Sequence, residues 1–274
     1  MDNKSSKILE SLKPSKIILP LTVGLGVIIY LFASDDNLKW ADIVTNVQNA
    51  SIWWVLGAFL ALFARDAGYV YRIRHLTNKE LSWLSSIYVI ILWEFASALT
   101  PSVVGGTAVV IFIINKEKIP FGKSLAYVML TAVLDNLFFV LAAAFVIFFN
   151  AFPELSLNMV GSDSKLPVQT IFTVSAVLIA AYTFVMIFGL FVKPKALKWL
   201  LVNATYNRFL RGFREAAIRN GNDIILASKQ LRGMTRNYWL RAIISTIFIW
   251  SARYLIVNCL IAAFTDVNFM DHVM

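Results

Sequence analysis

Five ionisable residues interrupt long apolar runs of this sequence: Arg65, Asp66, Glu94, Asp135 and Arg253. A charge at the centre of a membrane-spanning helix costs at least about 2.5 to 3.5 kcal/mol on insertion scales, so five such charges suggest a polar interior. Glu94 and Asp135 each lie about ten residues, or about 16 Å of helix, from the cytoplasmic ends of their runs, close to mid-membrane. We therefore expect the five to line a substrate path, with Arg65 and Arg253 attracting a phosphate and with Glu94 and Asp135 handling a cation or a proton.

The same charges also have a purely structural explanation. Arg65 or Arg253 could pair with Asp66 or Asp135 and lock two helices together, because buried charges are usually paired whatever else they do. Two of the carboxylates, Asp66 and Asp135, could in principle form an aspartyl dyad, but neither stands in a Gly-x-Gly-Asp setting. Five charges beside a broken helix favour the path over the structural pair.

A helix break is expected between two apolar stretches, residues 83–99 and 107–114. The intervening residues include Thr100, Pro101, Ser102, Gly105 and Gly106. Proline removes a backbone donor and obstructs the preceding turn, while the two glycines loosen the backbone beyond it. An irregular backbone survives in hydrocarbon only where it is buried in protein or faces water, so these five residues are candidates for a gate.

The composition is that of an all-α integral membrane protein, a polytopic helical bundle with a broken, partly re-entrant hairpin. Of 274 residues, 59% are hydrophobic and only 15% are charged, and the mean hydropathy is +0.70. The formal net charge of +9 is carried by basic residues between the apolar runs, an arrangement typical of membrane topology and not of nucleic-acid binding. We therefore expect no nucleic-acid partner.

The apolar runs divide a single transmembrane domain, residues 1–274, into about six spans. These are residues 17–33, 52–71, 83–99 with a broken arm 106–115, 125–149, 167–192 and 238–264. Lysines before the first span predict a cytoplasmic N-terminus, and Arg72 and Arg74 return the second span to the cytoplasm. Residues 193–236 predict cytoplasmic amphipathic helices on the membrane surface, with Gly221 and Gly233 at helix ends.

Catalytic motifs are not found in the sequence. His75 and His272 fall outside the spans, and there is neither a His-Glu-x-x-His pair nor a phosphate-binding Gly-x-x-x-x-Gly-Lys loop. No serine within a span has a histidine at its depth. We expect no cofactor, no metal site and no catalytic residue, and an enzyme is the less favoured interpretation.

Three segments resemble the lysylphosphatidylglycerol synthase transmembrane domain family, also called flippase-like. They are residues 97–106 (SALTPSVVGG), 115–124 (NKEKIPFGKS) and 131–136 (TAVLDN). The resemblance covers roughly residues 15–270, and Pro101, Gly105, Gly106 and Asp135 match best. It implies a broken membrane segment and movement of an aminoacylated or otherwise modified phospholipid, or of a related lipid-linked headgroup, between leaflets.

Two family features are not found in residues 1–274. Members commonly have a second Pro-Gly-Gly-type segment, and the members that make the aminoacyl lipid carry a cytoplasmic transferase domain. The expectation is therefore translocation without synthesis, in the cytoplasmic membrane of a bacterium. The expected partners are anionic or aminoacylated membrane phospholipids, and a homo-oligomer is compatible with this assignment. The alternatives are a non-transporting accessory protein of envelope-lipid synthesis and an intramembrane enzyme acting on a lipid-linked substrate.

Overall fold

The computed structural model describes residues 22, 26, 30, 40–99, 103–149, 168–206 and 211–264. Every regular element in these ranges is a helix, which confirms the all-α class. In chain order the elements are α3 (Trp40–Asn49), α4 (Ile52–Leu76), α5 (Trp83–Leu99), α6 (Val103–Lys116), α7 (Phe121–Phe148), α8 (Val168–Ile187), the π-helix η1 (Phe188–Val192), α9 (Pro194–Ala204), the 3-10 helix η2 (Arg211–Phe213), α10 (Arg214–Arg232) and α11 (Arg236–Phe264).

Three of the described helices are long and apolar enough to cross a membrane: Phe121–Phe148, Thr170–Val192 and Arg236–Phe264. Helix α5 is similarly apolar but shorter. Helix α4 has 25 residues, but Arg65 and Asp66 lower its hydropathy. Large apolar side chains stay exposed along all of these helices, for example Phe63, Phe148 and Phe184, as expected where lipid replaces water.

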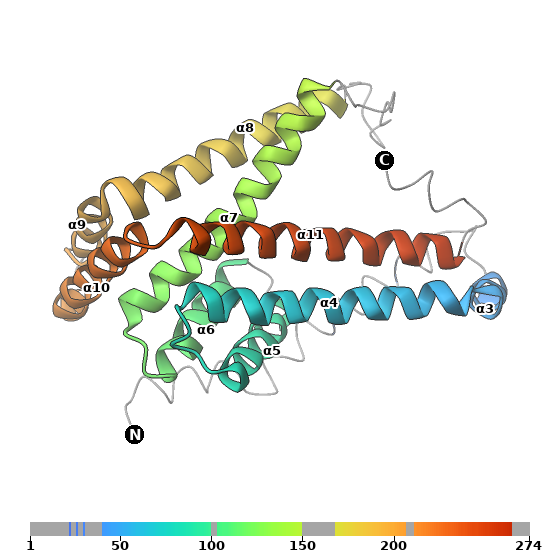
Figure 1. Cartoon of the computed structure of the whole chain (residues 1–274), viewed down its shortest axis with the longest axis horizontal. Helices are drawn as coiled ribbons and strands as arrows, with labels where there is room; N and C mark the ends of the chain where they lie inside the picture. Colours follow the sequence, from blue (N-terminus) through green and yellow to red (C-terminus); the bar gives the residue numbers. More distant parts are fainter. Residues whose placement is uncertain are drawn as a thin grey trace. The chain divides into compact units, whose positions relative to one another are not determined.

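The described residues fall into two compact units, and α4, α5, α6 and α11 each contribute to both. In the first unit, the start of α4 lies beside the end of α11 (Figure 1). The backbone N–H of Ser51 donates to the carbonyl of Ala263 at 3.0 Å. A Cβ on Gly57 would lie 3.5 Å from the Cys259 sulfur, so the two helices approach to ordinary van der Waals distance there.

In the second unit, α10 packs against α7 and α9, and α7 packs against α8 (Figure 1). Two glycines make the close approaches. A Cβ on Gly122 of α7 would overlap the backbone carbonyl of Asn220, and one on Gly221 of α10 would overlap the side chain of Lys198 in α9. Buried Ser228 of α10 donates a hydrogen bond to the carbonyl of Leu190 in η1. The basic segment is thus packed in part against η1 and α7.

Of the two glycines predicted as helix ends, only one ends a helix. Gly233 is the C-cap of α10, as predicted. The prediction for Gly221 is wrong, because this residue lies buried in the middle of α10. Its small size serves packing, a demand that single-sequence reasoning about helix breakers does not separate from the termination of a helix.

The predicted break between α5 and α6 is shorter than expected. Helix α5 ends at Leu99 and α6 begins at Val103, and Thr100, Pro101 and Ser102 lie outside the described residues. Gly105 and Gly106 belong to helix α6 and do not interrupt it. Gly106 is buried, and an added Cβ there would overlap the hydroxyl of Ser97 in α5. Gly106 therefore allows two short helices to pack closely.

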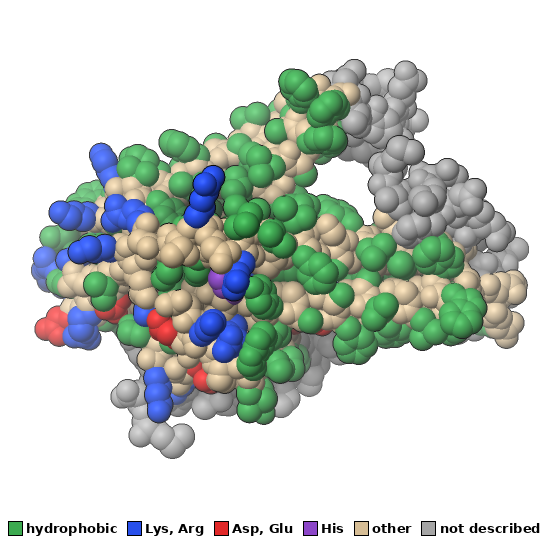
Figure 2. All heavy atoms as spheres, in the orientation of Figure 1, with side chains coloured by type: hydrophobic (Ala, Val, Ile, Leu, Met, Phe, Trp, Pro, Cys, Tyr) green, Lys and Arg blue, Asp and Glu red, His purple; other side chains and the backbone are tan. Residues whose placement is uncertain are grey.

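Basic and apolar side chains separate on the surface of the second unit. Figure 2 shows Lys and Arg gathered over α9 and α10, whereas the visible surface of α8 is mostly hydrophobic. Exposed Trp199 and Leu200 lie among the basic residues of α9. Aromatic residues interleaved with lysines are typical of helices that lie at a membrane interface.

Candidate functional site

Asp135 forms a bidentate ion pair with Arg72 in the second unit. Arg72 Nη1 donates to Asp135 Oδ1 at 2.5 Å, and Nη2 donates to Oδ2 at 3.1 Å. The side chain of Arg72 is 2% exposed and that of Asp135 is 25% exposed. Two parallel hydrogen bonds from a guanidinium are among the strongest interactions that a carboxylate forms in proteins. Burial also reduces the screening of this ion pair by solvent.

Three elements position this pair. Arg72 lies near the end of α4, Asp135 lies in the middle of α7, and Thr246 of α11 accepts a further hydrogen bond from Arg72 Nη1 at 3.2 Å. The Thr246 hydroxyl in turn donates to the carbonyl of Ala242 at 2.9 Å, so its lone pair is turned toward the arginine. The centre of the Tyr69 ring lies 5.2 Å from the guanidinium carbon of Arg72. The guanidinium of Arg72 is thus held in one orientation by contacts from three side chains.

Arg72 was missed in the sequence because it was assigned to the cytoplasmic end of the second span. Helix α4 continues past this position to Leu76, and the Arg72 side chain is buried. One signal was available: Arg72 follows Arg65 by seven residues, which is two helical turns and therefore the same face.

An apolar cavity of about 300 Å³ lies between α7 and α11 beside this pair. Its lining includes Leu134, Phe138, Leu141, Ile243, Thr246 and Ile247. Thr246 supplies both a wall of the cavity and a partner of Arg72, and Leu134 immediately precedes Asp135. The cavity can therefore hold hydrocarbon, and Thr246 connects its wall to the buried guanidinium of Arg72.

A second charged cluster lies in the first unit, where Arg65 meets two carboxylates. Its Nε and Nη2 donate to Asp66 Oδ1 at 2.9 and 2.7 Å, and Nη2 lies 3.5 Å from Glu94 Oε2 in α5. The arginine side chain is 14% exposed, whereas that of Glu94 is 50% exposed. One cation faces two anions, so these three side chains together carry a negative charge.

The remaining charged residue predicted for the substrate path is Arg253. Arg253 is exposed on α11, with its guanidinium carbon 5.1 Å from the centre of the Trp250 ring. The structure thus brings together Arg65, Asp66 and Glu94, and it joins Asp135 to an arginine that was not predicted. Among the described residues, no group of three or more His, Cys, Asp or Glu is arranged to hold a metal ion.

Three described helices that are long and apolar enough to cross a membrane, with helix as the regular structure of the described ranges, define an integral membrane protein of the all-α class. The chain belongs to the family of the lysylphosphatidylglycerol synthase TM region, whose family model matches residues 17–273. This match confirms the resemblance seen in residues 97–106, 115–124 and 131–136. No curated protein and no solved structure matches the chain. Membership relates the protein to lipid modification or transport and to an association with membrane lipids.

Proposed function

We propose that this protein moves a phospholipid, or a related lipid-linked headgroup, between the leaflets of the membrane. The observation that carries the proposal is the Arg72–Asp135 pair, which Thr246 connects to the apolar cavity between α7 and α11. A lipid needs a polar route for its headgroup and a hydrocarbon surface for its chains. The pair and the cavity place both kinds of surface side by side.

The bidentate pair supports a binding role for Arg72 and Asp135 because each of them could exchange its partner for a group of the lipid. A phosphate can replace the carboxylate on Arg72, since guanidinium binds either group with the same two-pronged geometry. Asp135 would then be released to accept a cation or a proton. The Asp135 side chain is 25% exposed, so a headgroup can approach it from the protein surface.

The cluster of Arg65, Asp66 and Glu94 supports recognition of a positive group. Its two carboxylates outnumber its arginine, and Glu94 is half exposed. Such a cluster attracts the ammonium of an aminoacylated or zwitterionic headgroup more readily than a free phosphate. Within the proposed path, Arg65 therefore holds the carboxylates in place, while Glu94 meets the cation.

The proposed function also implies an orientation of the protein in the membrane. The N-terminus and the basic helices α9 and α10 would face the cytoplasm, where anionic lipids attract each basic group by about 1 kcal/mol. The protein would reside in the cytoplasmic membrane of a bacterium. Residues 100–102, with Gly105 and Gly106 in the first turn of α6, would form a gate, and Arg253 would contact lipid phosphates from the outer surface of α11.

The test is a leaflet-resolved lipid-scrambling assay in proteoliposomes with the joint variant Arg72→Met/Asp135→Leu. Replacing a buried ion pair by apolar residues of similar size is often neutral for stability, so the fold should survive. The matched control is Glu215→Gln/Arg219→Gln, which also removes one acid and one base, from an exposed pair in α10. Transport that is lost only in the first variant supports the path.

Two outcomes would overturn the proposal. Unchanged transport in Arg72→Met/Asp135→Leu would make the pair a purely structural tie between helices. If the wild-type protein moved no lipid of any headgroup tested, an accessory role or an intramembrane enzyme acting on a lipid-linked substrate would replace translocation.

A further inference from the structure

A pocket of about 280 Å³, lined by several polar and charged side chains, lies where the end of α4 meets the start of α11, within the second unit. Residues His75, Asn78 and Lys79 line it from the α4 side, and Thr235, Asn237 and Arg241 line it from the α11 side. The pocket is slightly smaller than most cavities that enclose a whole small molecule. Its size suits one polar group of a larger molecule.

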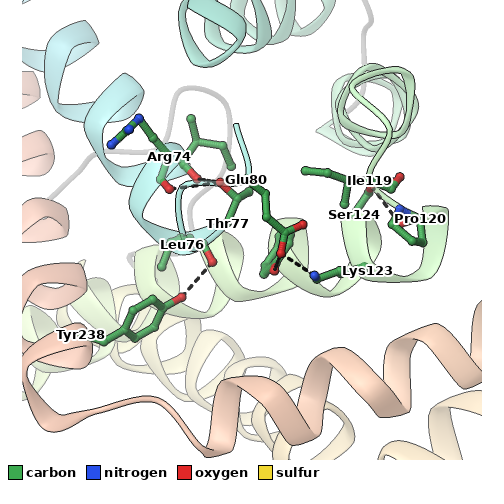
Figure 3. A network of polar contacts seen from close by, with 11 residues as sticks. Arg74, Leu76, Thr77, Glu80, Ile119, Pro120, Lys123, Ser124 and Tyr238 are labelled. Carbon is green, nitrogen blue, oxygen red and sulfur yellow. Dashed lines mark hydrogen bonds and ion pairs between the residues drawn. The ribbon is translucent and has the colours of Figure 1, made fainter. Parts of the chain in front are cut away.

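The walls of this pocket are held in place by hydrogen bonds. The Tyr238 hydroxyl donates to the carbonyl of Leu76 at 2.9 Å, as Figure 3 shows. His75 Nε2 lies 2.9 Å from the Tyr238 carbonyl, and the two rings stack with centroids 4.6 Å apart. A carbonyl oxygen can only accept, so Nε2 is the protonated nitrogen of His75. The two helices are therefore clamped across the base of the pocket.

The turn after α4 is fixed as well. Asn78 and Lys79 have φ values of 51° and 64°, in the left-handed region that non-glycine residues seldom adopt. The turn is closed by hydrogen bonds from Lys79 N to the Arg74 carbonyl at 2.9 Å and from Glu80 N to the Thr77 carbonyl at 3.0 Å. The Glu80 side chain pairs with Lys123 (Figure 3). Backbone strain held by surrounding contacts is common at ligand sites.

The pocket carries positive charge that the described residues do not neutralise. Within the ranges that the structure describes, neither Lys79 nor Arg241 forms an ion pair. No acidic residue lines the pocket, and the first turn of α11 contains none. The N-terminus of a helix is itself positive, so Arg241 in its second turn adds like charge there. A bound anion would relieve this repulsion.

We propose that this pocket binds a phosphate group, supplied by the headgroup of an anionic phospholipid. Lys79 and Arg241 provide charge-assisted hydrogen bonds, and the side chains of Asn78, Thr235 and Asn237 provide neutral ones. The charged and polar lining suits the phosphate, and the acyl chains would remain in the bilayer. An isolated phosphate ion has the same chemistry, and competition by inorganic phosphate separates the two sources.

The position of the pocket connects it with the Arg72–Asp135 pair. His75 follows Arg72 by three residues in α4, and Thr246 follows Arg241 by five residues in α11, so both sites lie along the same two helices. A phosphate released from the pocket would meet Arg72 about one helical turn away. Only this handover rests on the proposed function, since binding of a phosphate by the pocket does not require transport.

The test is native mass spectrometry of the full chain in detergent micelles with added phosphatidylglycerol or phosphatidylcholine. The variant is Lys79→Gln/Arg241→Gln, and the matched control is Arg219→Gln/Lys229→Gln, which removes two positive charges from α10. We expect the wild type to prefer phosphatidylglycerol. Its affinity should fall about tenfold or more in the pocket variant and less than twofold in the control. The charge-retaining variant Lys79→Arg/Arg241→Lys should keep most of the binding and shows that loss is not caused by misfolding.

Inorganic phosphate at millimolar concentration provides the second arm. Displacement of phosphatidylglycerol by inorganic phosphate would assign the pocket to the free ion, and a failure to displace it would assign the pocket to the lipid headgroup. Equal loss in the pocket variant and in the α10 control would overturn the proposal in favour of diffuse surface electrostatics. Unchanged binding in Lys79→Gln/Arg241→Gln would overturn it directly. A protein that binds lipid through this pocket but scrambles none would contradict only the proposed translocation.

Discussion

The guanidinium of Arg72 and the carboxylate of Asp135 meet through two hydrogen bonds, of 2.5 and 3.1 Å, across 63 positions of the sequence. The contact ties the end of α4 to the middle of α7 within one compact unit. Because Arg72 is almost completely buried, its charge depends on these bonds and on Thr246. The pair is therefore both a structural connection and the group around which the proposed path is built.

Removal of one partner of this pair should destabilise the protein strongly. Asp135→Leu leaves the Arg72 cation buried without its carboxylate, and we expect a loss of about 3 to 5 kcal/mol in the free energy of unfolding. Equilibrium unfolding in detergent, followed by circular dichroism, measures this change. Arg72→Met/Asp135→Leu should recover most of the stability, and a double variant as unstable as Asp135→Leu would show that the charges do not depend on each other.

Gly106→Ala should weaken the packing of α5 on α6. The new methyl group would overlap the hydroxyl of Ser97 and lie 3.2 Å from its Cα, so the two helices must separate. We expect a loss of about 1 to 3 kcal/mol in the free energy of unfolding, despite the better helix propensity of alanine. The control is Gly57→Ala, where the added Cβ would meet only the Cys259 sulfur, at 3.5 Å. Equal effects of the two substitutions would contradict the close approach at Gly106.

Gly122→Ala should loosen α10 from α7. Its Cβ would overlap the backbone carbonyl of Asn220 and the Cβ of Asp223, neither of which is the flexible end of a side chain. Limited proteolysis within residues 205–213 should therefore become several times faster in this variant than in the wild type. At Gly212 nothing lies within 4 Å of an added Cβ, so Gly212→Ala should leave the cleavage rate unchanged. If Gly122→Ala were cleaved at the same rate as the wild type, the position of α10 would not depend on this contact.

Glu94→Gln should affect the transport of cationic headgroups more than stability. Its carboxylate is half exposed and lies 3.5 Å from Arg65, which keeps its shorter hydrogen bonds to Asp66. We expect a change of less than about 1 kcal/mol in the free energy of unfolding. Transport of an aminoacylated lipid should fall about tenfold, the ratio that corresponds to about 1.4 kcal/mol of lost interaction.

The comparison lipid for this variant is phosphatidylglycerol, which has no ammonium group. Its transport by Glu94→Gln should be close to that of the wild type in the same proteoliposome assay. An equal loss of transport for both lipids would show that Glu94 does not bind the ammonium group. Glu117→Gln, at the turn after α6, provides a control for the loss of one carboxylate elsewhere in the chain.

The α5–α6 region illustrates how far sequence reasoning reaches. Pro101 predicted an interruption after residue 99, and the described helices do end at Leu99 and resume at Val103. The same reasoning extended the break through Gly105 and Gly106, which are helical. Glycine lowers helix propensity by only about 1 kcal/mol, so a packing contact such as that with Ser97 can outweigh it. Local preference alone does not show which demand a glycine meets.

The sequence by itself determined the membrane class, the all-α architecture and the family, because hydropathy and motif spacing are properties of consecutive residues. It also identified Arg65, Asp66, Glu94 and Asp135 as charges in apolar surroundings. Only the tertiary structure decided that Arg72 is the partner of Asp135, and that Lys79 and Arg241 face one pocket. Which residues 63 or 162 positions apart come together depends on which helix faces meet, and the packing of side chains sets those faces, not the local pattern.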